Sequence, residues 1–162
     1  MHVIHPRPLT KADFAPFGEV LEMAGARSFV INDGMATRFH DLARVDVAAG
    51  GGRPAISIFK AQPATLPLDI AMFERHPLAS QAFYPLSGRS WLVVVASDDA
   101  GRPGEIEAFL ASGTQGVNYA RGVWHHPLLA LGEISDFLVV DRVGNGDNLE
   151  ETRLELSCRL ER

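Results

Sequence analysis

Residues 91–110 read Trp-Leu-Val-Val-Val-Ala-Ser-Asp-Asp-Ala-Gly-Arg-Pro-Gly-Glu-Ile-Glu-Ala-Phe-Leu and show the pattern of the whole chain. Two short segments, 91–96 and 105–110, are rich in apolar residues and have strand character. The segment between them, 97–104, is polar and contains Gly and Pro, which favour turns. The region therefore predicts two strands joined by a loop.

The same alternation of short apolar segments and turns extends over the rest of the chain. Fifteen Gly and 10 Pro interrupt it, which is typical of strands and leaves little room for long helices. One short helix is expected from Thr10, whose hydroxyl can cap it, with Asp13 in its first turn and a stop at Gly18. We expect an all-β fold in one domain, residues 1–162, with one or two short peripheral helices. Further strands are expected at Ala55–Phe59, Ala82–Leu86, Leu128–Leu131 and Phe137–Val140.

The last segment, 153–161, has the most regular period. Leu154, Leu156, Cys158 and Leu160 alternate with polar residues, which predicts a half-buried antiparallel strand. Cys158 then lies on the apolar side, where burial raises the pKa of a thiol, so we expect an inert core residue. As an edge strand, this segment would be available for pairing with a second copy.

Composition excludes several classes of protein. The 162 residues are 46% hydrophobic and 22% charged, which predicts a soluble globular domain rather than a disordered or membrane-spanning chain. A net charge of −5 argues against nucleic acid as a partner. A single cysteine permits neither an intramolecular disulfide nor a multi-cysteine zinc site. With no targeting segment recognisable at the N-terminus, the cytoplasm is the expected compartment.

Residues able to do chemistry gather in two stretches, 73–86 and 115–127. Phosphate-binding and dinucleotide-binding glycine loops and the serine-hydrolase elbow are all absent. His76 and the pair His125-His126 each lie beside an expected strand and a proline, which can hold a side chain at the mouth of a barrel. The alternative is that these histidines only line the barrel and catalyse nothing.

The spacing of these residues resembles a known metal site. Barrels of the cupin type bind one metal through His-x-His-x4-Glu-x6-Gly and a later Gly-x2-His. Glu74-x-His76-x4-Gln81-x6-Gly88 resembles the first pattern, and Gly122-x2-His125 the second. The resemblance implies a cupin-like antiparallel β-barrel of jelly-roll type.

In the two stretches that resemble this pattern, the metal ligands would be Glu74, His76 and His125. Imidazole and carboxylate suit nickel, manganese, iron or zinc, and period-2 alternation lets Glu74 and His76 face one cavity. Gln81, a neutral amide, is a poor ligand. Either it leaves the metal loosely held, or it hydrogen-bonds to the substrate.

A narrower resemblance runs over nearly the whole chain: the sequence resembles the ureidoglycolate lyases. It is carried by Asn32-Asp33-Gly34, Arg38–Leu42, Ala61–Ala64, Leu66-Pro67-Leu68, Glu74–Leu78, Gln81-Ala82-Phe83, Gln115–Tyr119, Val123–Leu128, Asp136-Phe137-Leu138 and Asp141-Arg142. The resemblance implies a homodimer that splits (S)-ureidoglycolate into glyoxylate and urea in allantoin breakdown. It also implies a divalent metal cofactor, Ni²⁺.

Ureidoglycolate carries a hydroxyl, a carboxylate and a urea nitrogen on one carbon. The hydroxyl must lose a proton and the leaving nitrogen must gain one, and a metal ion beside the hydroxyl lowers its pKa. We expect His126 as the proton donor, with Tyr119 second and His125 as both ligand and catalytic residue. Neighbouring strand residues face opposite ways, so His125 and His126 share a cavity only if Pro127 or a bulge bends the strand.

The substrate carboxylate requires a cation. Lys60 and Arg75 are the expected partners, although alternation turns Arg75 away from Glu74 and the alternative for both is a solvated surface role. Asn32, in a turn-forming Asn-Asp-Gly run, is expected to close over the ligand, and Gln81 to contact it.

Three other functions fit the same residues. A hydrolase would release ammonia from ureidoglycolate instead of urea. An iron-dependent oxygenase would consume dioxygen, but the usual ligand set is incomplete here. A non-catalytic barrel would bind the ureide without turnover, and the fold alone does not separate it from an enzyme.

Overall fold

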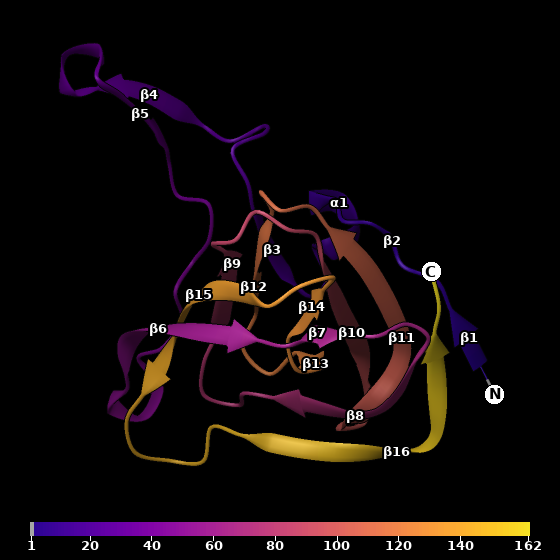
Figure 1. The fold of residues 1–162 in the computed structure, drawn as a ribbon. Coiled ribbons are helices and arrows are strands. Elements are labelled where there is room, and N and C mark those ends of the chain that lie inside the picture. Colours follow the sequence, from indigo (N-terminus) through magenta and orange to yellow (C-terminus); the bar gives the residue numbers. More distant parts are fainter. Residues whose placement is uncertain (1) are drawn as a thin grey trace.

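The computed structural model describes residues 2–162, and strands dominate it (Figure 1). The larger of two main sheets, called here the large sheet, has the path β1-β16-β8-β13-β10-β11-β2, with β14 added on β10 and β7 on β14. Its strands are β1 (His2–Ile4), β2 (Arg7–Pro8), β7 (Pro63–Ala64), β8 (Leu68–Arg75), β10 (Trp91–Asp99), β11 (Arg102–Ala111), β13 (Trp124–His125), β14 (Leu129–Leu131) and β16 (Glu150–Leu160).

The small sheet has the order β3-β12-β9-β15-β6, and a separate two-stranded arm projects from the body at the upper left of Figure 1. The small sheet consists of β3 (Gly18–Leu21), β6 (Arg53–Ala61), β9 (Gln81–Pro85), β12 (Gly116–Tyr119) and β15 (Ser135–Val143). The arm consists of β4 (Ser28–Ile31) and β5 (Ala36–Phe39), joined by the 3-10 turn η1 (Asn32–Gly34). The remaining helical elements are α1 (Lys11–Phe14) and the 3-10 turn η2 (Ala49–Gly51).

Strand β10 connects two apolar cores. Trp91, Val93 and Val95 enter the core between the two sheets, where β9, β12 and β15 also contribute. The alternate residues Leu92 and Val94 enter a second core, enclosed by the curled large sheet. Because both faces of β10 are buried, its sequence reads as a continuous apolar run rather than an alternating one.

The structure confirms the all-β fold, and every strand expected from the sequence is present, although Leu86, Leu128 and Glu161 lie just outside the observed strands. The two sheets stay separate along their edges in residues 2–162, so the predicted barrel is an open sandwich. The predicted short helix is α1, where the backbone N–H of Asp13 donates to the hydroxyl of Thr10 at 3.1 Å. Among the described helices, none has the length and apolar character needed to cross a membrane.

Two expectations, one about a loop and one about strand alternation, were wrong. The segment 97–104 is mostly strand, and only Ala100 and Gly101, with φ of 48° and 84°, form the turn. Leu156 is 87% exposed because β16 shifts register on β8 between Arg153 and Cys158, which takes the intervening residues out of the regular alternation. Cys158 is buried as predicted, and burial raises the pKa of its thiol.

Strand β16 pairs with β8 along one side, while β1 covers only residues 158–160 on the other side. Within the described residues, the rest of 153–161 has no strand partner on that side, so its pairing with a second copy stays a prediction.

The fold makes a specific demand at Gly113. A Cβ there would lie 2.1 Å from the backbone oxygen of Gly88, so Gly113→Ala is expected to lower the free energy of unfolding by about 3 kcal/mol. Gly101→Ala is the control, because open space surrounds Gly101 and only its left-handed φ costs energy, about 1 kcal/mol. Urea denaturation measures both, and equal losses would contradict the close approach of the two loops.

Candidate metal centre

Strands β8 and β13 place a carboxylate and an imidazole opposite each other. Glu74 and His125 are direct partners in the antiparallel pairing of these strands. Their neighbours Phe73 and Trp124 are fully buried in the core inside the large sheet. Since successive residues of a strand face opposite ways, Glu74 and His125 face the small sheet.

Two further side chains, those of His76 and Gln81, reach this position from residues that follow β8 in the chain. His76 lies just beyond the end of β8, and its ring centroid is 5.2 Å from that of His125. Gln81 opens β9 of the small sheet, and its Oε1 lies 3.0 Å from Nε2 of His76. The ligand atoms of Glu74, His76 and His125 all lie within 4.8 Å of one another. The structure therefore brings together the three predicted metal ligands.

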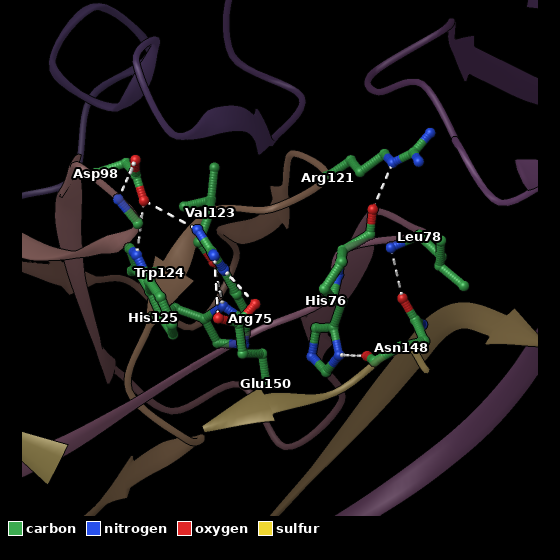
Figure 2. A network of polar contacts seen from close by, with 12 residues as sticks. Arg75, His76, Leu78, Asp98, Arg121, Val123, Trp124, His125, Asn148 and Glu150 are labelled. Atoms are coloured by element: carbon green, nitrogen blue, oxygen red, sulfur yellow. Dashed lines mark hydrogen bonds and ion pairs between the residues drawn. The ribbon is translucent and has the colours of Figure 1, made fainter. Parts of the chain in front are cut away.

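Both histidines direct their Nδ1 atoms away from this cluster. Nδ1 of His76 lies 2.8 Å from the carbonyl oxygen of Asn148, a contact drawn in Figure 2, and Nδ1 of His125 lies 3.0 Å from that of Val123. A carbonyl oxygen only accepts hydrogen bonds, so each Nδ1 carries a hydrogen and donates it. In the neutral ring, Nε2 is then a bare lone pair that faces the cluster.

With both imidazoles neutral, the cluster consists of acceptors that face each other without a hydrogen between them. Nε2 of His76 faces Oε1 of Gln81, and Nε2 of His125 lies 3.3 Å from Oε1 of Glu74. Nε2 of His125 is buried and has no hydrogen-bond partner within the part of the chain that the structure describes. We call these four atoms the acceptor cluster. Two imidazoles, a carboxylate and an amide oxygen fit a divalent cation, which would satisfy all four.

The charge of Glu74 supports this fit. Burial favours the neutral carboxyl and raises its pKa, but in the acidic range where Glu74 titrates, the hydrogen bond from His125 and the charges of protonated His125, His76 and His126 outweigh burial, so the pKa is lowered overall. Glu74 is therefore ionised at neutral pH and supplies the one negative charge of the acceptor cluster.

Tyr119 supports the ring of His125 from the small sheet. The two rings are stacked, with centroids 4.1 Å apart and an angle of 9° between their planes. Tyr119 is buried, and burial together with the charge of Glu74 raises the pKa of its hydroxyl. Tyr119 therefore keeps its proton and holds the imidazole plane of His125 in place.

His126 lies at a bulge. Val95 pairs with His125 and Leu92 pairs with Leu129, so the segment 126–128 contains one residue more than β10 opposite it. The Nδ1 atom of His126 contacts the carbonyl oxygen of Pro127 at 2.8 Å. Burial lowers the pKa of this imidazole, which is neutral at neutral pH. The bend that the sequence required of this segment is present, although His126 is not part of the acceptor cluster.

Arg75 contacts Asp98 and Glu150 rather than the acceptor cluster, and Figure 2 draws these contacts. Its guanidinium stacks 4.2 Å from the ring centroid of Trp124 and contacts Glu150 at 2.8 and 3.0 Å and Asp98 at 2.9 Å. Nε1 of Trp124 also donates to Asp98 at 3.0 Å. We call these four residues the Arg75 clamp. The clamp ties the strands that carry Glu74 and His125 together from the opposite face.

Two other residues that were predicted to contact the substrate, Lys60 and Asn32, also lie outside the acceptor cluster. Lys60 pairs with Asp136 at 2.8 Å on an exposed face, ~17 Å along β15 from Asp141. Asn32 begins η1, the turn that joins the two strands of the arm, and the arm projects away from the two main sheets in Figure 1.

Three residues near the acceptor cluster were not predicted. Asp141 accepts a hydrogen bond from Nε2 of Gln81 at 3.2 Å, and Asn148 binds His76. Arg121 donates from Nε to the carbonyl oxygen of Pro77 at 2.6 Å, next to His76. Arg121 lies inside the polar stretch 115–127, whereas the partners of Asp141 and Asn148 are some 60 to 70 residues away in sequence and leave no local signal.

Two imidazoles, a carboxylate and an amide oxygen lie together inside an all-β sandwich. This donor set suits a divalent cation, so the chain is a β-sandwich protein with a candidate metal site. The sequence model of the family described as ureidoglycolate lyase matches residues 1–161. The chain belongs to the ureidoglycolate lyase family.

Similar proteins bear the same description. "Ureidoglycolate lyase" of Burkholderia mallei (strain NCTC 10229) is 57% identical over 160 residues, 99% of this chain and 94% of the relative. That of Brucella anthropi is 59% identical over 144 residues, 89% and 85% of the two chains. A solved structure of a mutant of Bacillus subtilis oxalate decarboxylase matches with a TM-score of 0.40 and 16% identity, over 62% of this chain and 24% of that chain.

The Arg75 clamp predicts a measurable contribution to stability. Arg75→Gln is expected to lower the free energy of unfolding by about 2 kcal/mol, because it removes charged hydrogen bonds and the stack on Trp124. Arg102→Gln is the matched control, since Arg102 and Glu155 form an exposed ion pair expected to contribute under about 0.5 kcal/mol. If urea denaturation gives the two variants the same stability, the clamp does not hold the strands together.

Proposed function

We propose that this protein is a lyase that cleaves (S)-ureidoglycolate to glyoxylate and urea, as a step of allantoin breakdown. The observation that carries the proposal is the acceptor cluster inside a chain of the ureidoglycolate lyase family. Glu74, His76 and His125 would hold the divalent cation, for which the family resemblance favours Ni²⁺. When bound, such a cation supplies Lewis-acid activation of the substrate hydroxyl.

The cleavage moves one proton and consumes none. The hydroxyl oxygen loses a proton as the C–N bond breaks and the aldehyde carbonyl forms, and the urea nitrogen gains one. His126 suits this transfer, because its imidazole is neutral and its Nδ1 is occupied by Pro127, which leaves Nε2 to accept the proton and pass it on. Tyr119, which keeps its hydroxyl proton, is the second candidate for delivering a proton to nitrogen.

Arg121 is the cation we propose for the substrate carboxylate, in place of Lys60 and Arg75, whose charges are paired with acids. The backbone N–H of Gly122 donates to the carbonyl oxygen of His76 at 3.0 Å, so the loop that carries Arg121 is tied to the acceptor cluster. The side chain is exposed, and no carboxylate in residues 2–162 lies within ion-pair distance of it. Its fork of N–H donors matches a carboxylate.

The function is tested by incubating metal-stripped protein, with and without Ni²⁺ or Mn²⁺, with racemic ureidoglycolate. We expect urea and glyoxylate to rise together above the spontaneous background once the metal is restored, with half of the racemate consumed. His125→Ala is expected to reduce this rate at least 100-fold. His40→Ala is the control, because His40 packs on Phe29 at the arm.

Other outcomes of this assay would contradict the proposal. Ammonia in place of urea would indicate a hydrolase, and dioxygen consumption an oxygenase. Ureide binding without turnover under any metal would indicate a non-catalytic barrel.

We also propose that two copies of the chain associate through the outer face of the small sheet. Ile58 pairs with Leu138 and Ile56 with Val140 in the ladder of β6 and β15, so all four share this face. On the opposite face, Phe137 and Val139 of β15 fill the core between the sheets, and Ala61 of β6 packs against it. A sheet that is apolar on both faces favours a covering partner, and the arm adds the exposed apolar residues Val30 and Met35.

The association is tested by light scattering coupled to size-exclusion chromatography. Wild type is expected at the mass of two chains, and the double variant Ile56→Asp/Ile58→Asp at the mass of one. Leu156→Asp is the control, an exposed leucine on β16 of the other sheet. A wild type that runs as a single chain would overturn this proposal. Retention of the dimer in the double variant would place the interface elsewhere.

We further propose that the protein is located in the cytoplasm. Its support is the single cysteine, Cys158, which is a buried free thiol.

A further inference from the structure

Gln81 lies between two groups that would each accept a hydrogen bond from it. Its Oε1 faces Nε2 of His76 at 3.0 Å, and its Nε2 donates to Oδ2 of Asp141 at 3.2 Å. The opposite orientation of the amide would exchange these two atoms. Its NH₂ group would then donate to the bare Nε2 of His76, and its oxygen would face the carboxylate of Asp141.

The reversed amide would satisfy the acceptor cluster from within the protein. Nε2 of His76 would gain a hydrogen bond, and the hydrogens of the amide would occupy the space where a cation must bind. The carboxylate of Asp141 opposes this reversal, because an ionised carboxylate accepts hydrogen bonds and repels an amide oxygen.

We propose that Asp141 is a positioning residue that holds Oε1 of Gln81 toward the acceptor cluster and so makes Gln81 the fourth donor to the divalent cation. This inference rests on the proposed function, since it assumes that the cluster holds a cation. It assigns to Gln81 a role different from the substrate contact expected from the sequence. The donor set then consists of two imidazole nitrogens and two oxygens, with the single negative charge on Glu74.

The same contact accounts for the residue type at position 81. A glutamate there would place its carboxylate against that of Asp141, at about the 3.2 Å that now separates the amide nitrogen from Oδ2. Two ionised carboxylates at this separation repel each other. With Gln81 and Asp141, the cation would contact a neutral amide oxygen, and the negative charge of Asp141 would lie behind Gln81 without contacting the cation.

The test compares cation affinity in variants of position 141. Asp141→Leu removes the acceptor at similar size, and metal-stripped protein is expected to bind Mn²⁺ and Co²⁺ 10- to 100-fold more weakly by calorimetry. Asp136→Leu, on the same strand but on the exposed face beside Lys60, is the control and is expected to bind as wild type does. The visible absorption of bound Co²⁺ is expected to change only in Asp141→Leu, because that variant alone loses a donor.

A reciprocal variant keeps the inference testable if Asp141→Leu fails to fold. In Gln81→Glu/Asp141→Asn the total charge is unchanged, and the asparagine NH₂ now donates to the glutamate, whose other oxygen faces the cluster. Its affinity is expected within about threefold of wild type, or tighter. A cation affinity of Asp141→Leu equal to that of Asp136→Leu would overturn the positioning role while leaving the proposed function intact. Failure of the wild type itself to bind a cation would instead contradict the proposed function.

Discussion

Two carbonyl oxygens, those of Asn148 and Val123, determine the chemistry of the site. Each accepts a hydrogen bond from Nδ1 of one histidine. The Nε2 lone pairs of His76 and His125 are therefore directed at a carboxylate and an amide oxygen. Acceptors that face each other in a partly buried site are unfavourable without a cation between them. The arrangement is therefore stable only in a fold that holds each member from outside, and the rest of the molecule supplies those constraints.

The constraints come from both sheets. Phe73 and Trp124 anchor β8 and β13 in the core of the large sheet, and alternation then turns Glu74 and His125 to the other face. The Arg75 clamp ties the same strands on the opposite side, and the small sheet contributes Tyr119, stacked on His125, and Gln81. A site at the meeting of two sheets moves only if the packing of the sandwich moves, which suits the precise placement a metal site requires.

The sequence predicted what depends on local pattern. Turn residues and short apolar runs indicated the strands, and the spacing of Glu74, His76 and His125 indicated the candidate ligands that the structure brings together. The long-range partners were not predictable, because Arg75 and Glu150 are 75 residues apart in sequence and Gln81 and Asp141 are 60 residues apart. Alternation failed at Leu156 because a register shift in β16 changes which face a residue occupies, and no residue type marks such a shift.

In the proposed site, both imidazoles offer Nε2 to a cation while Nδ1 stays protonated. Nitrogen-15 NMR of the histidine side chains, recorded before and after one equivalent of the diamagnetic ion Zn²⁺, tests it most directly. We expect that Nδ1 of His76 and His125 remains protonated throughout and that the resonance of Nε2 in both shifts to the position of a metal-bound nitrogen, with the other histidines unchanged. A hydrogen on Nε2 that survives the addition of the metal would contradict it.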